Sequence, residues 1–159
     1  MKSLLVSFSI HHNNTEKIAN VFAKVLDAQI KKPQQIDPEE LQEYGLIGFG
    51  SGIYDQKHHI LLLDLADRLP QVTDGKAFIF STSGVARKFA TDKSIDDPHS
   101  PLREKLESKG YTIVDEFNCA GFNTNSFLKY VGGMNRGKPN SGDLKDAEEC
   151  AMNLKRNLQ

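Results

Sequence analysis

Hydroxyl, amide and imidazole side chains gather in residues 9–15, which read Ser-Ile-His-His-Asn-Asn-Thr. This segment lies between a short apolar run and a stretch with helical spacing of apolar residues. A helix N-terminus favours a phosphate group, because its backbone N–H groups are unpaired and the helix dipole is positive there. Neutral donors would be added by Ser9, Asn13, Asn14 and Thr15. The segment is thus either a phosphate site without lysine or arginine, or a polar turn that only caps the helix.

Two later segments could contact a planar ring. Residues 50–54 read Gly-Ser-Gly-Ile-Tyr, and Tyr54 could stack on such a ring while the glycines let the backbone approach it. Residues 81–84 read Ser-Thr-Ser-Gly and could bring backbone N–H groups to polar ring atoms. The alternatives are a surface tyrosine and an ordinary tight turn.

Other catalytic patterns are missing from the sequence. We find no Gly-x-Gly-x-x-Gly after a strand, no Walker loop and no Gly-x-Ser-x-Gly elbow, and no serine-histidine-acid set is readable. Cys119 and Cys150 form no CxxC pair, which indicates two reduced thiols in a cytosolic protein. Cys119 ends a predicted strand near the candidate site, and we expect it to be packed rather than redox-active.

The elements that must position these segments alternate along the chain. Apolar runs predict strands at residues 4–8, 28–31, 46–50, 76–80 and 111–119. Helical spacing of apolar residues begins at Asn13, where Glu16 completes a capping box, and three more helices end near Pro70, Gly110 and Leu158. Between the second and third strands lies a polar loop with one helical turn after Pro38. Strand-helix repeats predict an α/β three-layer sandwich with a parallel sheet, in which ligands bind beyond the carboxyl ends of the strands.

Composition limits the class of protein. The 159 residues suit a single domain, 1–159, and hydrophobic residues make up 38%. Lysine plus arginine is 20 against 21 aspartate plus glutamate, which argues against a nucleic-acid partner and gives no polybasic membrane anchor. No apolar stretch approaches the ~18 residues of a membrane span, and the first apolar run is too short for a signal peptide. We therefore expect a cytoplasmic protein.

The ordered set of motifs resembles the flavodoxin family over essentially the whole chain. The resemblance rests on residues 9–19, ending in NTEKIA, on 48–54 (GFGSGIY) and on 80–84 (FSTSG). Residues 133–140 (GMNRGKPN), followed by Asp143-Leu144, are similar to a flavodoxin-like subgroup. The resemblance implies a five-stranded parallel sheet in the order 2-1-3-4-5, with FMN at the switch point.

The resemblance also assigns roles to residues. The loop from Ser9 to Thr15 would hold the FMN phosphate, and the other two segments would flank the isoalloxazine ring. The implied cofactor-binding residues are Ser9, His11, His12, Asn13, Asn14, Thr15, Ser51, Gly52, Ile53, Tyr54, Ser81, Thr82, Ser83 and Gly84.

The sequence departs from the family pattern at three points. The phosphate loop has His11-His12-Asn13 where Thr-Gly is usual, and it is one residue longer. There is no tryptophan and no tyrosine in the second ring segment, where Phe89 could substitute. The chain is nearly neutral, whereas electron-carrier flavodoxins are acidic. Either a local acidic patch compensates or the partners differ, and the candidate patch residues are Asp55, Asp92, Asp96 and Asp97.

Four of the five histidines fall in or beside the first and third strand-following loops: His11, His12, His58 and His59. Adjacent histidines rarely point the same way, so we expect no metal site. We hypothesise that His11 or His12 contacts the phosphate or the flavin edge. FMN affinity should then fall as pH rises through about 6.5. Exposed histidines that only flank a helix are the alternative.

The functional expectation is an FMN-binding, flavodoxin-type electron carrier between redox partner proteins. It needs no catalytic residue, because the flavin does the redox chemistry. One alternative is an FMN-dependent NAD(P)H:quinone-type oxidoreductase, in which the long segment 121–140 would shape a pocket over the ring. The other is a flavin-free binding module of the same fold.

Overall fold

A computed structural model describes residues 2–9, 14–54, 57–83, 97–120, 139 and 141–158. For Tyr54, Ser83 and Ala120 the description covers the backbone alone. The predicted cap at Asn13 therefore lies outside the described residues.

Five parallel strands form the centre of the molecule. They are β1 (Ser3–Phe8), β2 (Gln29–Lys31), β3 (Leu46–Tyr54), β5 (Gly75–Ser83) and β6 (Tyr111–Ala120). Their order is β2-β1-β3-β5-β6, which confirms the predicted 2-1-3-4-5 arrangement. The sequence did not predict β4 (Lys57–His58), a short antiparallel strand that pairs with the end of β3.

The strands β3 and β5 run further than their apolar residues indicated. We expected loops after residues 50 and 80, but 51–54 and 81–83 belong to the strands. The ladder continues through polar residues, because Ser51 pairs with Ser81 and Gly52 with Thr82. Backbone hydrogen bonding to neighbouring strands therefore extends past the point where hydrophobic patterning stops.

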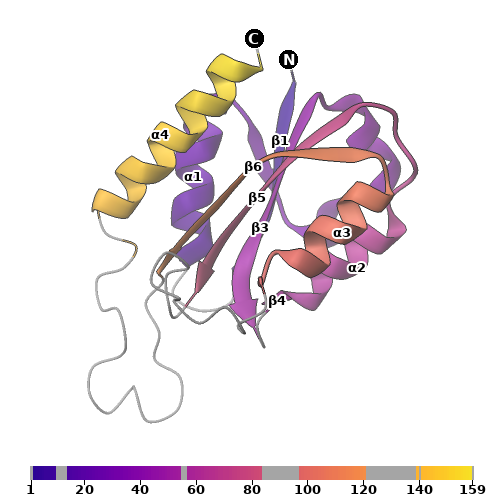
Figure 1. The fold of residues 1–159 in the computed structure, drawn as a ribbon, viewed down its shortest axis with the longest axis horizontal. Coiled ribbons are helices and arrows are strands. Elements are labelled where there is room, and N and C mark those ends of the chain that lie inside the picture. Colours follow the sequence, from indigo (N-terminus) through magenta and orange to yellow (C-terminus); the bar gives the residue numbers. More distant parts are fainter. Residues whose placement is uncertain are drawn as a thin grey trace.

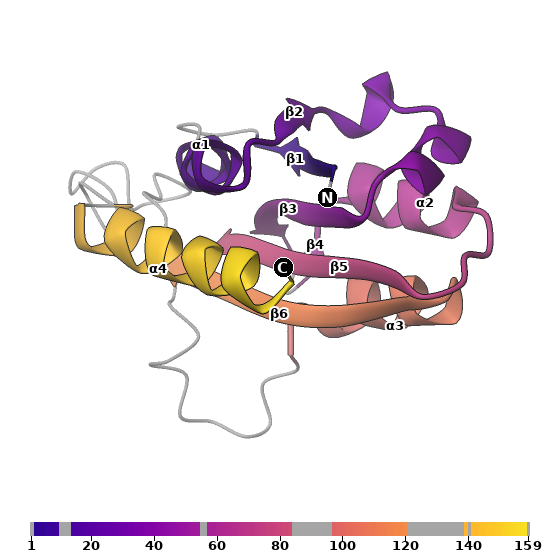
Figure 2. The same ribbon diagram turned by 90° about the horizontal axis from the view of Figure 1, so that it is seen from above.

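Helices cover both faces of the sheet, as predicted (Figures 1 and 2). On one face lie α1 (Asn14–Leu26) and α4 (Ser141–Asn157), and on the other lie α2 (Ile60–Arg68) and α3 (Ser100–Ser108). Two 3-10 turns, η1 (Pro33–Gln35) and η2 (Pro38–Glu43), join β2 to β3. Within the described ranges no helix is long and apolar enough to cross a bilayer.

Alternating strand residues build two cores, one on each face. Toward α2 and α3, the strand residues Leu4, Ile47, Phe49 and Ile79 pack with helix leucines. Toward α1 and α4, the strand residues Leu5, Phe78 and Phe80 pack with Phe22. Each central strand is therefore buried on both faces, which is why it reads as a continuous apolar run.

Gly50, whose place in the sequence suggested a point of ligand approach, has a packing role in the core. A Cβ atom at this position would overlap the ring of Phe80. Gly110 has φ +99 and follows α3, which agrees with its predicted place as a helix terminator.

Candidate functional site

The candidate site lies at the carboxyl edge of the sheet, at the reversal of strand order. β1 has β2 on one side and β3 on the other, so the chain turns in opposite directions from this strand. At the edge, Phe8 pairs with Ser51, and Ser51 pairs with Ser81. Such a switch point is the usual ligand site of an open α/β sheet.

A buried hydrogen bond joins two of the predicted segments at this edge. The hydroxyl oxygens of Thr15 and Thr82 lie 2.9 Å apart. Thr15 is in the first turn of α1 and 1% exposed, whereas Thr82 is near the end of β5 and 4% exposed. The contact brings the N-terminus of α1 next to the end of β5. Asn14, beside Thr15, is also buried.

The structure describes only part of the predicted site set. The residues described with their side chains are Ser9, Asn14, Thr15, Ser51, Gly52, Ile53, Ser81 and Thr82. Tyr54 and Ser83 are described through their backbone. His11, His12, Asn13 and Gly84 lie outside the described residues, as does Phe89.

Ser51 is occupied by contacts within the chain. Its Oγ donates to the Gly52 carbonyl at 2.7 Å, accepts from the His59 backbone N–H at 3.0 Å and lies 2.9 Å from Nδ1 of His58. Because the hydroxyl hydrogen is used on Gly52, Nδ1 of His58 is the donor in the third contact. Ser51 therefore fixes the turn from β3 into β4 and the start of α2.

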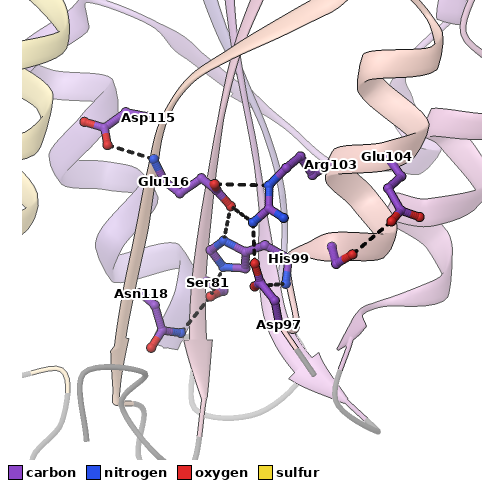
Figure 3. Close-up of polar contacts among 9 residues, drawn as sticks. Ser81, Asp97, His99, Arg103, Glu104, Asp115, Glu116 and Asn118 are labelled. Carbon is purple, nitrogen blue, oxygen red and sulfur yellow. Dashed lines mark hydrogen bonds and ion pairs between the residues drawn. The ribbon is translucent and has the colours of Figure 1, made fainter. Parts of the chain in front are cut away.

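The fully buried hydroxyl of Ser81 belongs to a second network on the same face of the sheet (Figure 3). Ser81 Oγ lies 2.6 Å from Nε2 of His99, whose Nδ1 lies 2.9 Å from Oε1 of Glu116. Asn118 Nδ2 donates to Ser81 Oγ at 2.7 Å. Because the carboxylate accepts from Nδ1–H, a neutral His99 accepts from the Ser81 hydroxyl at Nε2.

Arg103 closes this network on its solvent side. Its Nη2 donates to Glu116 and to Asp97, both at 2.6 Å, and its Nε donates to Glu116 at 3.2 Å. Asp97 was one of the four acids considered for an acidic patch, and it pairs with Arg103, which it shares with Glu116. Asp55, Asp92 and Asp96 lie outside the described residues.

These contacts alter acid-base behaviour. The hydrogen bond from His99, followed by those from Arg103, lowers the pKa of Glu116 to about 2. The hydrogen bond to Glu116 raises the pKa of Arg103 above its usual range. Burial lowers the pKa of His58 well below 6.5, and the adjacent His99 adds to this effect. The network thus holds an ionised carboxylate and guanidinium beside a neutral His58.

The sequence showed no serine-histidine-acid set for nucleophilic catalysis, and it gave no sign of the contacts among Ser81, His99 and Glu116. Ser81, His99 and Glu116 form a hydrogen-bonded row although they come from three separate segments. Glu116 and Asn118 alternate along β6, and the β5–β6 register places Asn118 beside Ser81. The row is not arranged for nucleophilic attack, because Ser81 is 0% exposed and its oxygen already accepts from Asn118.

The two described loop histidines occupy different surroundings. The His59 ring packs 4.3 Å from that of Phe8, at the end of β1. The His58 ring lies 5.1 Å from the ring of His99. Over the described residues, no three His, Cys, Asp or Glu side chains come together as a possible metal site.

The two cysteines are on the opposite face. Cys119 is 5% exposed and packs in the core with α4. Cys150 donates from Sγ to Asp115 at 3.4 Å. Burial, and then the charge of Asp115, raise the pKa of Cys150 to about 12. At neutral pH this thiol is therefore protonated.

The sheet order and its edge define a flavodoxin-like fold, and solved structures agree. Flavodoxin 2 from Bacillus cereus superposes with a TM-score of 0.72, 17% identity and 99% coverage of both chains. A flavodoxin from the domain Archaea superposes with a TM-score of 0.66 and 17% identity, and the match covers 99% of this chain and 98% of that one. An azoreductase from Bacillus anthracis superposes with a TM-score of 0.63 and 9% identity, and the match covers 96% of this chain and 100% of that one.

At the level of sequence, no family model matches the chain. The chain belongs to the same family as the Uncharacterized protein MJ0298 of Methanocaldococcus jannaschii. The two are 45% identical over 157 residues, which cover 99% of this chain and 100% of that protein.

Proposed function

We propose that this chain binds FMN at the carboxyl edge between β1, β3 and β5 and carries electrons between redox partner proteins. The observation that carries the proposal is the buried contact between Thr15 and Thr82. It joins the start of α1, suited to a phosphate, to the end of β5, suited to a ring.

The described residues fit the cofactor chemically. The α1 N-terminus offers backbone N–H groups together with the neutral side chains of Asn14 and Thr15. A hydroxyl can donate once and accept twice, so Thr15 can accept from Thr82 and still donate to a phosphate oxygen. Bound FMN would supply the redox chemistry, because its ring accepts and releases electrons.

Each part of the chain then has a defined task. The α1 N-terminus would hold the phosphate, and the ends of β3 and β5 would orient the ring beside the buried networks of Ser51 and Ser81. Near-neutral net charge, 20 basic against 21 acidic residues, favours partners that do not depend on a strongly acidic surface.

A second candidate function is an FMN-dependent NAD(P)H:quinone-type oxidoreductase. It is supported by the structural likeness to the azoreductase from Bacillus anthracis. This function requires an open pocket over the ring, to which segment 121–140 would contribute. Apart from Pro139, that segment lies outside the described residues.

Reconstitution tests the proposal directly. Purified protein mixed with FMN and then freed of excess should retain flavin absorbance at about one equivalent. A chain that takes up no FMN would be the flavin-free module and would refute both flavin functions. Anaerobic addition of NAD(P)H separates the other two, because rapid bleaching without a partner protein supports the oxidoreductase and slow bleaching supports the carrier.

A further inference from the structure

The buried network around His99 carries an inference that rests on the proposed function and deepens it. Ser81 is a member of this network and pairs with Ser51 across β5 and β3, so the network includes a residue of the segments expected to flank the ring. Its polar groups come from four places: the end of β5, the segment before α3, α3 itself and β6 (Figure 3). We infer that His99 is the proton acceptor of this site, so that reduction of the bound flavin is coupled to uptake of one proton at Nε2 of His99.

The hydrogen bonds define where the proton goes. Nδ1 of His99 already donates to Glu116, so the one position left for a proton is Nε2. In the protonated ring Nε2–H donates to Ser81, and the Ser81 hydrogen turns away from His99. Asn118 cannot receive it through Nδ2, because that amide group is a donor. Protonation of His99 therefore reverses the direction of the Ser81 hydroxyl at the end of β5.

The charges facing His99 favour this uptake. Among the described residues, Glu116 and Asp97 each carry one negative charge and Arg103 carries one positive charge. The three together have a net charge of -1 while His99 is neutral, and protonation of His99 brings the network to zero. A fully buried imidazole can be charged only with such compensation, because burial otherwise disfavours the charged form.

His58 is the remaining titratable group beside His99, and it is unsuited to the same role. It is 1% exposed, and its Nε2 has no hydrogen-bond partner among the described residues. No carboxylate in the described part of the chain bonds to it, and its ring lies 5.1 Å from that of His99. Two adjacent imidazolium ions would repel each other, so the pair takes up one proton and His99 receives it.

The coupled step balances. A one-electron donor protein is oxidised, the cofactor gains the electron, and one proton leaves bulk water. A new N–H bond forms at Nε2 of His99, and the hydrogen bond from Ser81 to that nitrogen breaks. The electron and the proton bring opposite charges, so the net charge of the loaded protein does not change. Glu116 and Arg103 lie at the solvent side of the network, where their side chains are about a quarter exposed.

The test counts protons in the FMN-loaded protein. Midpoint potentials measured spectroscopically between about pH 5 and 8 give the protons taken up per molecule reduced. We expect His99→Gln to take up one proton fewer than the wild type, and Glu116→Gln to show the same loss. Glu104→Gln is the matched control, since Glu104 lies on α3, is exposed and bonds only to Ser100 in Figure 3. It should keep the wild-type count.

A second measurement needs no variant. Nitrogen NMR of the histidine rings should show one protonated nitrogen in His99 of the oxidised protein and two in the reduced protein. An unchanged His99 spectrum on reduction would overturn the inference, as would a wild-type proton count in FMN-loaded His99→Gln. In both cases the retained FMN leaves the proposed function standing. Wild-type protein that binds no FMN would remove the proposed function and this inference together.

Discussion

The hydroxyls of Thr15 and Thr82 meet at 2.9 Å although 67 residues separate them in the sequence. This bond holds the first turn of α1 against the end of β5. Because both side chains are buried, the bond is protected from competition with water and fixes the spacing of the two segments. The position of the proposed phosphate site relative to the proposed ring site therefore depends on this contact.

Thr15→Val should weaken FMN binding by about 10- to 100-fold, because a hydrogen bond to a charged group contributes roughly 1.5–3 kcal/mol. Valine keeps the shape of threonine but cannot donate to a phosphate. Titration of apoprotein with FMN, followed by flavin fluorescence, measures the change. The matched control is Thr112→Val, because Thr112 is exposed and lies at the start of β6, at the end of the sheet away from the candidate site. Equal affinities in the two variants would refute the phosphate assignment.

Glu116→Gln should lower the free energy of unfolding at pH 7 by about 1–3 kcal/mol, because His99 and Arg103 lose a charged partner. The pKa of Glu116 is about 2 in the folded protein, below its usual 4.5. Its stabilising effect is therefore complete above pH 4.5 and disappears as pH falls toward 2. Urea unfolding across this pH range should show a smaller decrease in the free energy of unfolding for Glu116→Gln than for Glu104→Gln. Parallel curves for the two variants would contradict the prediction.

Cys150 should react slowly with a thiol reagent in the native protein. Because the pKa of Cys150 is raised from 9.0 to about 12, its thiolate fraction near pH 8 is about a thousandth of that of an unperturbed cysteine. The measurement is the rate of disulfide exchange with an aromatic disulfide reagent, made in Cys119→Ser so that one thiol is followed. Asp115→Asn in the same background removes the neighbouring negative charge and should raise the rate. A native rate equal to that of the urea-unfolded chain would show that the thiol is not protected.

Gly50→Ala should destabilise the protein by about 1–3 kcal/mol, since its Cβ overlaps the ring of Phe80 and the core must rearrange. The free energy of unfolding is obtained from denaturant titration. Adding Phe80→Leu makes room for the methyl group, so the double variant should lose less than the sum of the single losses. Strict additivity would mean that the two side chains do not compete for the same space.

The sequence was sufficient for the architecture because hydrophobic periodicity is a local property. The apolar runs that became β1, β3 and β5 are buried on both faces, and the spacing of Leu62 and Leu65 marks the buried face of α2. The polar ends of β3 and β5 were misread as loops, since a ladder between neighbouring strands is invisible to patterning within one strand.

The sequence predicted which residues lie at the candidate site, but it did not predict which face of the sheet each side chain occupies. Sequence and resemblance predicted Thr15, Ser51, Ser81 and Thr82 as a set, but their side chains divide between the two faces of the sheet. Ser51 and Ser81 bond toward β4 and α3, whereas Thr82 bonds toward α1. Strand alternation could have predicted this division, had the strands been extended far enough.

Local patterning thus determined that this chain is a parallel α/β sandwich with a polar carboxyl edge. Only the tertiary structure decided that Ser81, His99 and Glu116 share one buried row. Their contacts depend on the β5–β6 register and on where α3 begins against the sheet, and both are set by packing among distant segments. The sequence lists the donors and acceptors, but the fold selects which of them meet away from water.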